Sequence, residues 1–465
     1  MERDPLERLR IWIEAEGFKG YDPYDALNSP LLSGLSLGNK YLRIAFIQTL
    51  KRLPVNLRPH LLVKKDYNPK GLGLFLWGYA KRYAREKEPQ CLEQISKLLD
   101  LLDGCKTQTF PLSFRRSTAL TGRLRNLSTP QCHFEERERR EILRISHPDK
   151  SGFEKTERDK ISPFGRNDMR DSRNDNGSDR APQNDIRQSS RNERLRHGWG
   201  YNFDWQSRAF FVPKYTPTVV NSSFIGHALL DAFAFTNLTR AKDLAFPIGE
   251  FILRDLHRLN EDGTVCFSYT PIDHYFVHNA NLLGASLLIR LYKETGNQEY
   301  KTTALAALAY SMKHQRPDGS WFYAENDIAH WIDSFHTGFN LQAIRYFLDL
   351  GFAEEYREQY EKGVRFYADH FFLADGTPKY YHDRVYPIDI HSPAQAIVFF
   401  SGLGRQYEEL TKKILNWMIE NMQGPSGAFY FQKHRYYTNK IHYMRWSQAW
   451  AFHALTEYFY NMNGA

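Results

Sequence analysis

Four glycines at near-regular intervals divide the second half of the chain into repeated segments. Gly263, Gly319, Gly376 and Gly427 are separated by 56, 57 and 51 residues. Each follows a stretch with helical periodicity and precedes an aromatic pair, a polar loop and a second apolar helical stretch. Self-similarity at such a period is typical of repeat proteins, in which one supersecondary unit stacks on the next. Two helices in about 55 residues predict a helical hairpin as that unit.

The same pattern of hairpins can be followed back through the first half of the chain. A short helix is predicted over 5–17, and inner and outer helices are predicted to begin in pairs near 71 and 90, 222 and 240, 279 and 298, 337 and 353, and 392 and 406. A sixth inner helix, near 446–460, would take its outer partner from the helix at 5–17. Six pairs can close into a ring, which removes the exposed apolar ends of an open array.

We therefore predict an all-α fold, an (α/α)6 toroid built from these hairpins as one domain over 1–465. An open array and a seven-pair ring are the alternatives. The segment 134–197 interrupts this pattern, because it is rich in mixed charges, Asn, Ser and Gly and almost lacks aliphatic and aromatic residues. Such a composition cannot bury enough apolar surface to offset the entropy lost on ordering. We predict that 134–197 is a disordered or weakly helical insertion within the domain.

Composition excludes several functional classes. The net charge of +8 arises from 62 basic and 54 acidic residues, far from the concentrated basic face of a nucleic-acid binder. The four cysteines have no CxxC spacing, which argues against a disulfide scaffold and a thiolate zinc site. No apolar run approaches the roughly 20 residues that span a bilayer, and the N-terminus has no apolar signal core. These features predict a cytoplasmic protein without a membrane span or nucleic-acid partner.

Three loops that lead into predicted inner helices share an Asp followed by a His. Asp273 precedes His278, Asp333 precedes His336, and Asp389 precedes His391, with Asn279, Thr337 and Ser392 as candidate helix caps. In a ring of hairpins these loops lie at one end, so their side chains would converge. Acid–base chemistry is therefore predicted for a cluster of Asp and His residues, with Asp333 and His336 as the leading pair: Asp273, His278, Asp327, His330, Asp333, His336, Asp389 and His391. The alternative is structural, because turn-forming Asp and packed His are common.

Aromatic and basic side chains near the same loops suit a polyhydroxylated ligand, since aromatic faces stack on sugars. The predicted substrate-binding residues are Tyr201, Asp204, Trp205, Arg208, His274, Trp321, Trp331, Tyr380, Arg384 and Arg445. The arginines favour an anionic saccharide, such as one containing uronic acid. Hydrolase, lyase and epimerase chemistry all remain open, and so do a non-catalytic glycan-binding or assembly role and a terpenoid cyclase or transferase role.

No cofactor motif is present. A divalent metal is an alternative because clustered His and Asp can bind one, but HExxH or a similar fixed spacing is absent.

Two resemblances add to these expectations. The segments QRPDGSW and MQGPSGAFYF resemble the glutamine–tryptophan repeats of terpenoid cyclase and protein prenyltransferase toroids, with Phe429 in place of Trp in the second. That resemblance implies the fold; the DxDD motif and the zinc ligands of those enzymes are missing. Residues 18–130 and 198–460 are similar to the VpsJ-like toroid proteins of surface-polysaccharide gene clusters, through GYDPYDALNSPLL, NPKGLGLFLWGY, WGYNFDWQSR and DSFHTGFNL. This similarity implies a cytoplasmic role in exopolysaccharide or glycan assembly.

Overall fold

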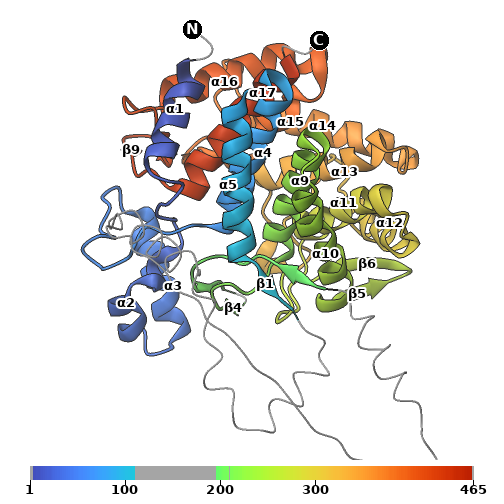
Figure 1. The fold of residues 1–465 in the computed structure, drawn as a ribbon, viewed down its shortest axis with the longest axis horizontal. Coiled ribbons are helices and arrows are strands. Elements are labelled where there is room, and N and C mark those ends of the chain that lie inside the picture. Colours follow the sequence, from blue (N-terminus) through green and yellow to red (C-terminus); the bar gives the residue numbers. More distant parts are fainter. Residues whose placement is uncertain (1–3, 110–194, 209, 463–465) are drawn as a thin grey trace, which may run out of the picture. The chain divides into compact units, whose positions relative to one another are not determined.

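The inner ring of the toroid consists of six helices. The computed structural model describes residues 4–109, 195–208 and 210–462. Within them each inner helix packs against the next, and the last packs against the first (Figure 1). The inner helices are α4 (Pro69–Glu86), α9 (Val219–Thr236), α11 (His278–Thr295), α13 (Ser334–Asp349), α15 (His391–Ser401) and α17 (Trp450–Met462).

An outer helix pairs with each inner helix. The outer helices are α5 (Pro89–Cys105), α10 (Thr239–Asp255), α12 (Gln298–Lys313), α14 (Arg357–Phe371), α16 (Glu408–Met422) and, for α17, the N-terminal helix α1 (Asp4–Ala15). The predicted (α/α)6 toroid is confirmed, including the N-terminal origin of the sixth outer helix.

Two equivalent glycine turns show how α1 completes the ring. Gly319, which follows α12, has a φ of +94°, and a Cβ added there would lie 2.6 Å from the carbonyl oxygen of Lys362 in α14. Gly427, which follows α16, has a φ of +89°, and its Cβ would lie 2.6 Å from the carbonyl oxygen of Arg8 in α1. Only glycine fits this close approach and adopts this backbone conformation without strain. Helix α1 thus occupies the position after α16 that α14 occupies after α12.

The glutamines of the same turns make equivalent hydrogen bonds. Gln315 Nε2 donates to the carbonyl oxygens of Gly319 and Gln359, both at 2.9 Å. Gln423 Nε2 donates to the carbonyl oxygens of Gly427 and Pro5, both at 2.8 Å. Each glutamine therefore joins its own turn to the next outer helix, which is a structural reason for the Gln–Gly spacing seen in the sequence.

Burial distinguishes the two rings. Inner helix α15 is buried along its whole length, because neighbouring helices surround it. Outer helix α14 buries one face, with Tyr360, Val364 and Tyr367 at helical spacing. The core therefore lies within and between the rings.

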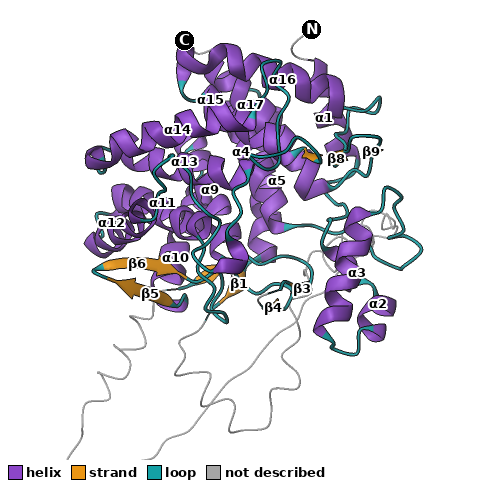
Figure 2. Ribbon diagram, turned by 180° about the vertical axis from the view of Figure 1, so that it is seen from behind, coloured by secondary structure: helices purple, strands orange, loops and turns teal. Residues whose placement is uncertain are grey.

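Short strands and minor helices organise the loops (Figure 2). The strand pairs are antiparallel: β1 (Thr107–Gln108) with β2 (His197–Gly198), β3 (Trp205–Gln206) with β4 (Phe211–Val212), β5 (Arg258–Glu261) with β6 (Thr264–Phe267), and β7 (Ile388–Asp389) with β8 (Gln432–Lys433), which also pairs with β9 (Thr438–Asn439). Helices α2 (Pro30–Leu35) and α3 (Lys40–Arg52) lie between α1 and α4 in the chain, and the π-helical turn η6 (Met444–Ala449) precedes α17. Among the described residues no helix is both long and apolar enough to cross a bilayer.

The insertion predicted over 134–197 lies outside the described residues except for 195–197. His197 is buried in β2, so the folded part of the chain already includes this residue.

The predicted helix caps are wrong in detail. Helix α13 begins at Ser334, so Thr337 lies inside its first turn, and Asp333 is the N-cap residue, accepting a hydrogen bond from the His336 amide. Asn279 and Ser392 likewise lie inside the first turns of α11 and α15. The helices begin earlier in the sequence than predicted and the loops before them are shorter. Asp333 therefore lies at the N-terminus of α13.

Candidate functional site

A cavity of about 230 Å³ lies where the inner helices begin. Every inner helix contributes to its wall, through the first residues of the helix or the turn before it: Lys70, Val220, Asn279, His336, His391 and Arg445. Residues that are far apart in the sequence therefore meet at one end of the toroid, as the repeat predicts. We call this space the inner cavity.

A second cavity of about 420 Å³ adjoins the inner cavity. Five aromatic residues line both spaces: Tyr24, Trp205, Tyr323, Trp331 and Tyr381. We call this second cavity the outer space. Helix α3 contributes one of its walls through Ile44, Ile47 and Gln48, and the loop after β3 contributes Arg208 and Phe210. Together the two spaces form a cleft with aromatic walls, of which the inner cavity is the smaller part.

Asp333 and His336 form a hydrogen-bonded pair in the inner cavity. Asp333 Oδ1 accepts the His336 backbone amide at 3.0 Å, and Oδ2 lies 2.7 Å from His336 Nδ1. Trp331 Nε1 also donates to Oδ2, at 3.0 Å. A carboxylate on Nδ1 favours the tautomer with the proton on that nitrogen. The Nε2 lone pair is then left for a ligand, and Nε2 makes no hydrogen bond within the described part of the chain.

His391 lies in the same cavity, at the first position of α15. Its ring stacks on Phe335 with centroids 4.7 Å apart and lies 4.3 Å from Trp450. Both ring nitrogens are buried and have no hydrogen-bond partner among the described residues. Burial, and then the charge of Lys70, holds the pKa of His391 well below its usual value. His391 is therefore a neutral imidazole whose hydrogen-bonding capacity is unused.

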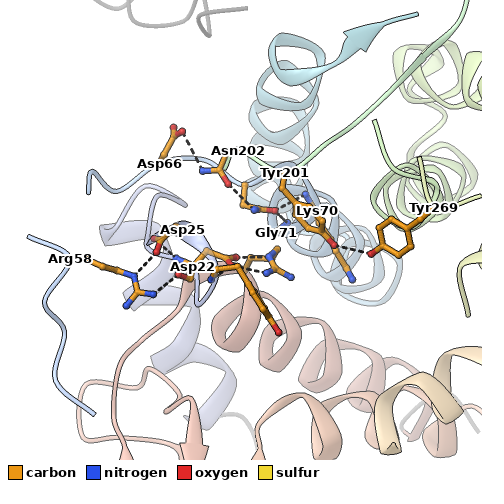
Figure 3. Close-up of polar contacts among 12 residues, drawn as sticks. Asp22, Asp25, Arg58, Asp66, Lys70, Gly71, Tyr201, Asn202 and Tyr269 are labelled. Carbon is orange, nitrogen blue, oxygen red and sulfur yellow. Dashed lines mark hydrogen bonds and ion pairs between the residues drawn. The ribbon is translucent and has the colours of Figure 1, made fainter. Parts of the chain in front are cut away.

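A buried ionic network lies beside the inner cavity (Figure 3). Arg445 donates to Asp22 from Nε (2.5 Å) and Nη2 (2.8 Å). Burial would lower the pKa of Arg445, but Asp22 more than offsets this and raises it. Arg58 in turn donates to Asp25 Oδ1 at 2.6 Å and to the Asp22 carbonyl oxygen at 2.8 Å. The N-terminal loop is thereby fixed against η6, with Tyr24 at the cleft.

Several tyrosines complete the wall as hydrogen-bond donors. Burial raises the pKa of Tyr269, Tyr323 and Tyr380 well above the usual value, so these phenols keep their protons. Tyr201 and Tyr269 approach each other with hydroxyl oxygens 3.5 Å apart. Phenol hydroxyls beside aromatic faces are well matched to a sugar ring, which has both apolar faces and hydroxyl groups.

The structure brings together half of the residues predicted for the site. Those that line the cleft are Asp333, His336, His391, Tyr201, Trp205, Arg208, Trp331, Tyr380 and Arg445. The others lie outside both linings: Asp273, His278, Asp327, His330, Asp389, Asp204, His274, Trp321 and Arg384.

Most of the residues outside the cleft have local structural partners. Asp273 accepts the Thr270 and Tyr275 amides, both at 2.7 Å, and so stabilises its own turn. Asp389 accepts Trp446 Nε1 at 2.8 Å, which positions a ring of the cavity wall.

His278 and His330 both meet Glu325. The Nε2 of His278 lies 2.7 Å from Glu325 Oε1, and that of His330 lies 3.1 Å from the Glu325 carbonyl oxygen. Trp321 is buried and donates to the Ser311 carbonyl oxygen, while Arg384 is exposed and paired with Asp383. The structural interpretation of the repeated Asp–His pattern therefore fits the first loop, whereas the other two loops each place a histidine in the cavity.

Eleven residues that line the inner cavity were not predicted for the site from the sequence, among them Lys70, Tyr24, Tyr269 and Phe335. Lys70 had an available signal, because it directly precedes Gly71, the predicted start of the first inner helix. The aromatic residues had none, since one tyrosine or phenylalanine among many looks the same whether it lines a cavity or fills a core. In the described residues no group of three His, Cys, Asp or Glu side chains could hold a metal ion.

Comparison with solved structures identifies the architecture. The chain is similar to a cellobiose 2-epimerase from Bacillus thermoamylovorans, with a TM-score of 0.53, 11% identity, and coverage of 85% of this chain and 88% of that one. It is also similar to a sugar epimerase from a ruminal bacterium, with a TM-score of 0.52, 12% identity, and coverage of 87% and 90%. A GH76 α-mannanase from Bacteroides thetaiotaomicron gives a TM-score of 0.52, 11% identity, and coverage of 85% and 86%. The shared fold is the (α/α)6 toroid.

At these identities the likeness concerns the fold alone. No known sequence family and no curated protein matches the chain.

Proposed function

We propose that the chain is an enzyme that transfers protons at a carbon atom of a saccharide, as an epimerase or a lyase does. The observation that carries this proposal is the pair of histidines in the inner cavity. His336 is oriented by Asp333 with its Nε2 free, and His391 is neutral with both nitrogens unpartnered among the described residues. Two such groups can remove a proton and return one.

The reaction follows from the chemistry of a sugar carbon next to a carbonyl. One histidine, in its neutral form, accepts the proton of the C–H bond. The electron pair of that bond forms a carbon–carbon double bond while the carbonyl π electrons move onto the carbonyl oxygen, which gives an enediolate. The other histidine, in its protonated form, returns a proton to the opposite face of the same carbon to give the epimer, or protonates an oxygen substituent that leaves from the next carbon to give the product of a lyase. The reaction exchanges the protonation states of the two histidines, and proton exchange with water restores them without an oxidant.

Glycoside hydrolysis is less well supported. That reaction usually requires two carboxyl groups on opposite sides of the scissile bond. Asp333 is the only acidic residue among the described residues that line the inner cavity, and it already accepts hydrogen bonds from Trp331 and His336. Among the described residues, no Asp or Glu lines the outer space.

The aromatic walls are compatible with a saccharide and also with an apolar cyclase substrate. The cyclase alternative is weaker because histidines, tyrosine hydroxyls and the Arg445–Asp22 pair lie in the same narrow space. The names of the similar structures, which include two sugar epimerases, support a sugar ligand. The resemblance to VpsJ-like proteins supports a place in exopolysaccharide or glycan assembly, in the cytoplasm, as part of this proposal.

The test is proton exchange with solvent. The protein is incubated in D2O with cellobiose, mannobiose and a glucuronic-acid-terminated disaccharide, and the products are followed by NMR and by the ultraviolet absorbance of unsaturated sugars. We expect deuterium at a sugar carbon or a new double bond, and loss of both in His336→Asn. His330→Ala is the control, because this histidine is exposed and outside the cleft.

Three outcomes would contradict the proposal. New reducing ends without carbon-bound deuterium would identify a hydrolase. Exchange that persists in both His336→Asn and His391→Phe would remove these histidines from the reaction. Binding of the sugars without exchange or cleavage would favour the glycan-binding alternative, which the aromatic walls also suit.

A further inference from the structure

Lys70 is a buried lysine in the inner cavity that the proposed proton transfer does not use. It is the second residue of α4, and its side chain is only 3% exposed. Its Nζ lies 4.2 Å from the centroid of the Phe224 ring and 5.4 Å from those of Phe339 and Trp450. Figure 3 shows it beside Tyr201 and Tyr269, with which it lines the cavity.

No acceptor of the described chain satisfies this amino group. Its Nζ makes no hydrogen bond and no ion pair with any described residue, although a buried lysine normally has a partner. Lys81, three turns further along α4, provides the contrast. Its Nζ lies 3.3 Å from Glu457 and 3.6 Å from Asp231.

The other charges around the cavity are already matched. Arg445 is paired with Asp22 by two hydrogen bonds, and Asp333 accepts hydrogen bonds from Trp331 and His336. Burial, followed by the charge of Arg445, holds the pKa of Lys70 well below its usual value. The lowered pKa favours the neutral amine while the cavity is empty, and no carboxylate of the described residues pairs with Lys70 to restore its proton.

The helix arrangement adds a second preference for negative charge. All six inner helices begin at this cavity, and the N-terminus of a helix carries a partial positive charge and free amide donors. Some of these donors are capped, as at Asp333 and at Asn68, which accepts the Lys70 amide at 3.1 Å. Lys70 therefore lies in a space whose surroundings favour an anion.

We infer that Lys70 binds a carboxylate of the substrate, so that the saccharide is a uronic acid or ends in one. This inference rests on the proposed function only in taking the ligand to be a saccharide. A single unpaired lysine matches a singly charged group, because a bound carboxylate raises the pKa of the amine and the resulting ammonium donates a charge-assisted hydrogen bond. Lys70 lines the inner cavity of about 230 Å³, so a sugar residue bound there would have its carboxylate within reach of the amine.

The experiment compares two disaccharides that differ in one group. Cellobiose and glucuronosyl-β-1,4-glucose have the same linkage, and only the second carries a carboxylate at C6 of its terminal sugar. Binding of each to the full-length protein is measured by calorimetry. We expect the wild type to prefer the acidic sugar by about ten-fold or more.

Lys70→Met should abolish this preference by weakening binding of the acid, with cellobiose binding unchanged within about two-fold. Lys81→Met is the matched control, because it removes a buried lysine of the same helix outside the cavity. It should retain the preference in whatever fraction is folded, as checked by circular dichroism. Lys70→Arg retains a cation and should retain part of the preference.

Equal binding of both sugars by the wild type, absence of acid binding at millimolar concentration, or a preference that survives Lys70→Met would each overturn the inference. A loss of turnover on neutral sugars without a change in binding would also overturn it, and would assign Lys70 to charge that develops during the reaction. The proposed proton transfer fails separately, when exchange survives the histidine substitutions. The preference for the acidic sugar therefore tests the role of Lys70, and deuterium exchange tests the proposed proton transfer.

Discussion

The two ends of the inner ring both contain buried histidines, lysine and arginine, but they differ in whether every charged side chain has a partner. At the far end from the inner cavity lie Trp77, Lys81, His227, Asp231, Arg290, His453 and Glu457, which we call the far cluster. Asp231 accepts Trp77 Nε1 at 2.7 Å and Arg290 Nη2 at 2.5 Å. Every charged side chain of the far cluster has a partner of opposite sign.

The inner cavity lacks this balance. His391 has two unpartnered nitrogens and Lys70 has no acceptor among the described residues, whereas in the far cluster His227 contacts both Arg290 and Ser286. Leaving buried polar groups unpaired costs free energy, so unpaired groups gathered around a cavity are groups that a ligand can satisfy. In the far cluster the charged side chains are paired with one another, which indicates a structural role, although His453 Nδ1 and Glu457 Oε2 are buried there without a hydrogen bond among the described residues. We therefore expect the far cluster to contribute to stability and the inner cavity to activity, although both are built on the inner helices.

The largest expected effect is the loss of activity in His391→Phe. Removing one of two proton-transfer groups should lower kcat by about 10²- to 10⁴-fold. The free energy of unfolding should stay equal or rise slightly, because an apolar ring of similar shape replaces two unpartnered nitrogens. Turnover and chemical denaturation are measured on the same preparation. A large loss of stability would show that His391 has a structural role and would remove the contrast between the two ends.

Asp231→Asn should have the opposite effect. It leaves Arg290 and Lys81 without their shared carboxylate, and breaking a buried ion pair costs about 3–5 kcal/mol. Burial alone would raise the pKa of Asp231, but Arg290 and Lys81 lower it instead, so the native carboxylate is ionised. Denaturation should show the loss, while the folded fraction keeps its turnover. Asp327→Asn, at an exposed carboxylate, is the control and should change stability by less than about 0.5 kcal/mol.

Asp333→Asn tests a residue with both a structural role, as the N-cap of α13, and a proposed role in catalysis. The amide retains an oxygen for the His336 backbone N–H and so preserves the cap, but it no longer fixes the proton on His336 Nδ1. We expect kcat to fall about 100-fold with KM nearly unchanged, since the wrong tautomer blocks proton transfer rather than binding. Single-turnover kinetics and binding of the same sugar separate these effects. A change in KM alone would instead assign Asp333 to substrate binding.

The repeat made the ring predictable from the sequence, because equally spaced turns and apolar periodicity follow directly from the helical hairpin. The spacing also pointed to Asp333 and His336. It could not separate His391 from His278, whose loops contain the same residue types. In the longer first loop Asp273 stabilises its own turn, and His278 contacts Ser311 of α12.

Lys70 and Lys81 show the same limit. Both belong to α4, and the sequence contains no sign that only Lys81 meets carboxylates, because Asp231 and Glu457 come from other helices. Which side chains face a cavity depends on distances of a few ångströms between helices, and these are set by packing across the whole ring.

The smallest expected effect concerns pH and applies to His453 in the far cluster. Burial lowers the pKa of His453 from 6.5 to about 3. The unfolded chain therefore binds a proton at this position between those values while the folded protein does not. Stability from this residue is complete above pH 6.5 and is lost progressively as the pH falls toward 3, by up to about 1.4 kcal/mol per pH unit.

His453→Phe should reduce the dependence of the unfolding free energy on pH below 6.5 by that amount, as measured by denaturation at several pH values. It should leave turnover unchanged because the His453 ring stacks on Trp77, away from the cavity. The same substitution at His391 should also reduce the acid slope, since burial depresses that pKa as well, but it should abolish proton transfer. Two histidines with the same electrostatic signature would then differ only in activity. If both variants stayed active, an unpartnered buried nitrogen would be no guide to function in this fold.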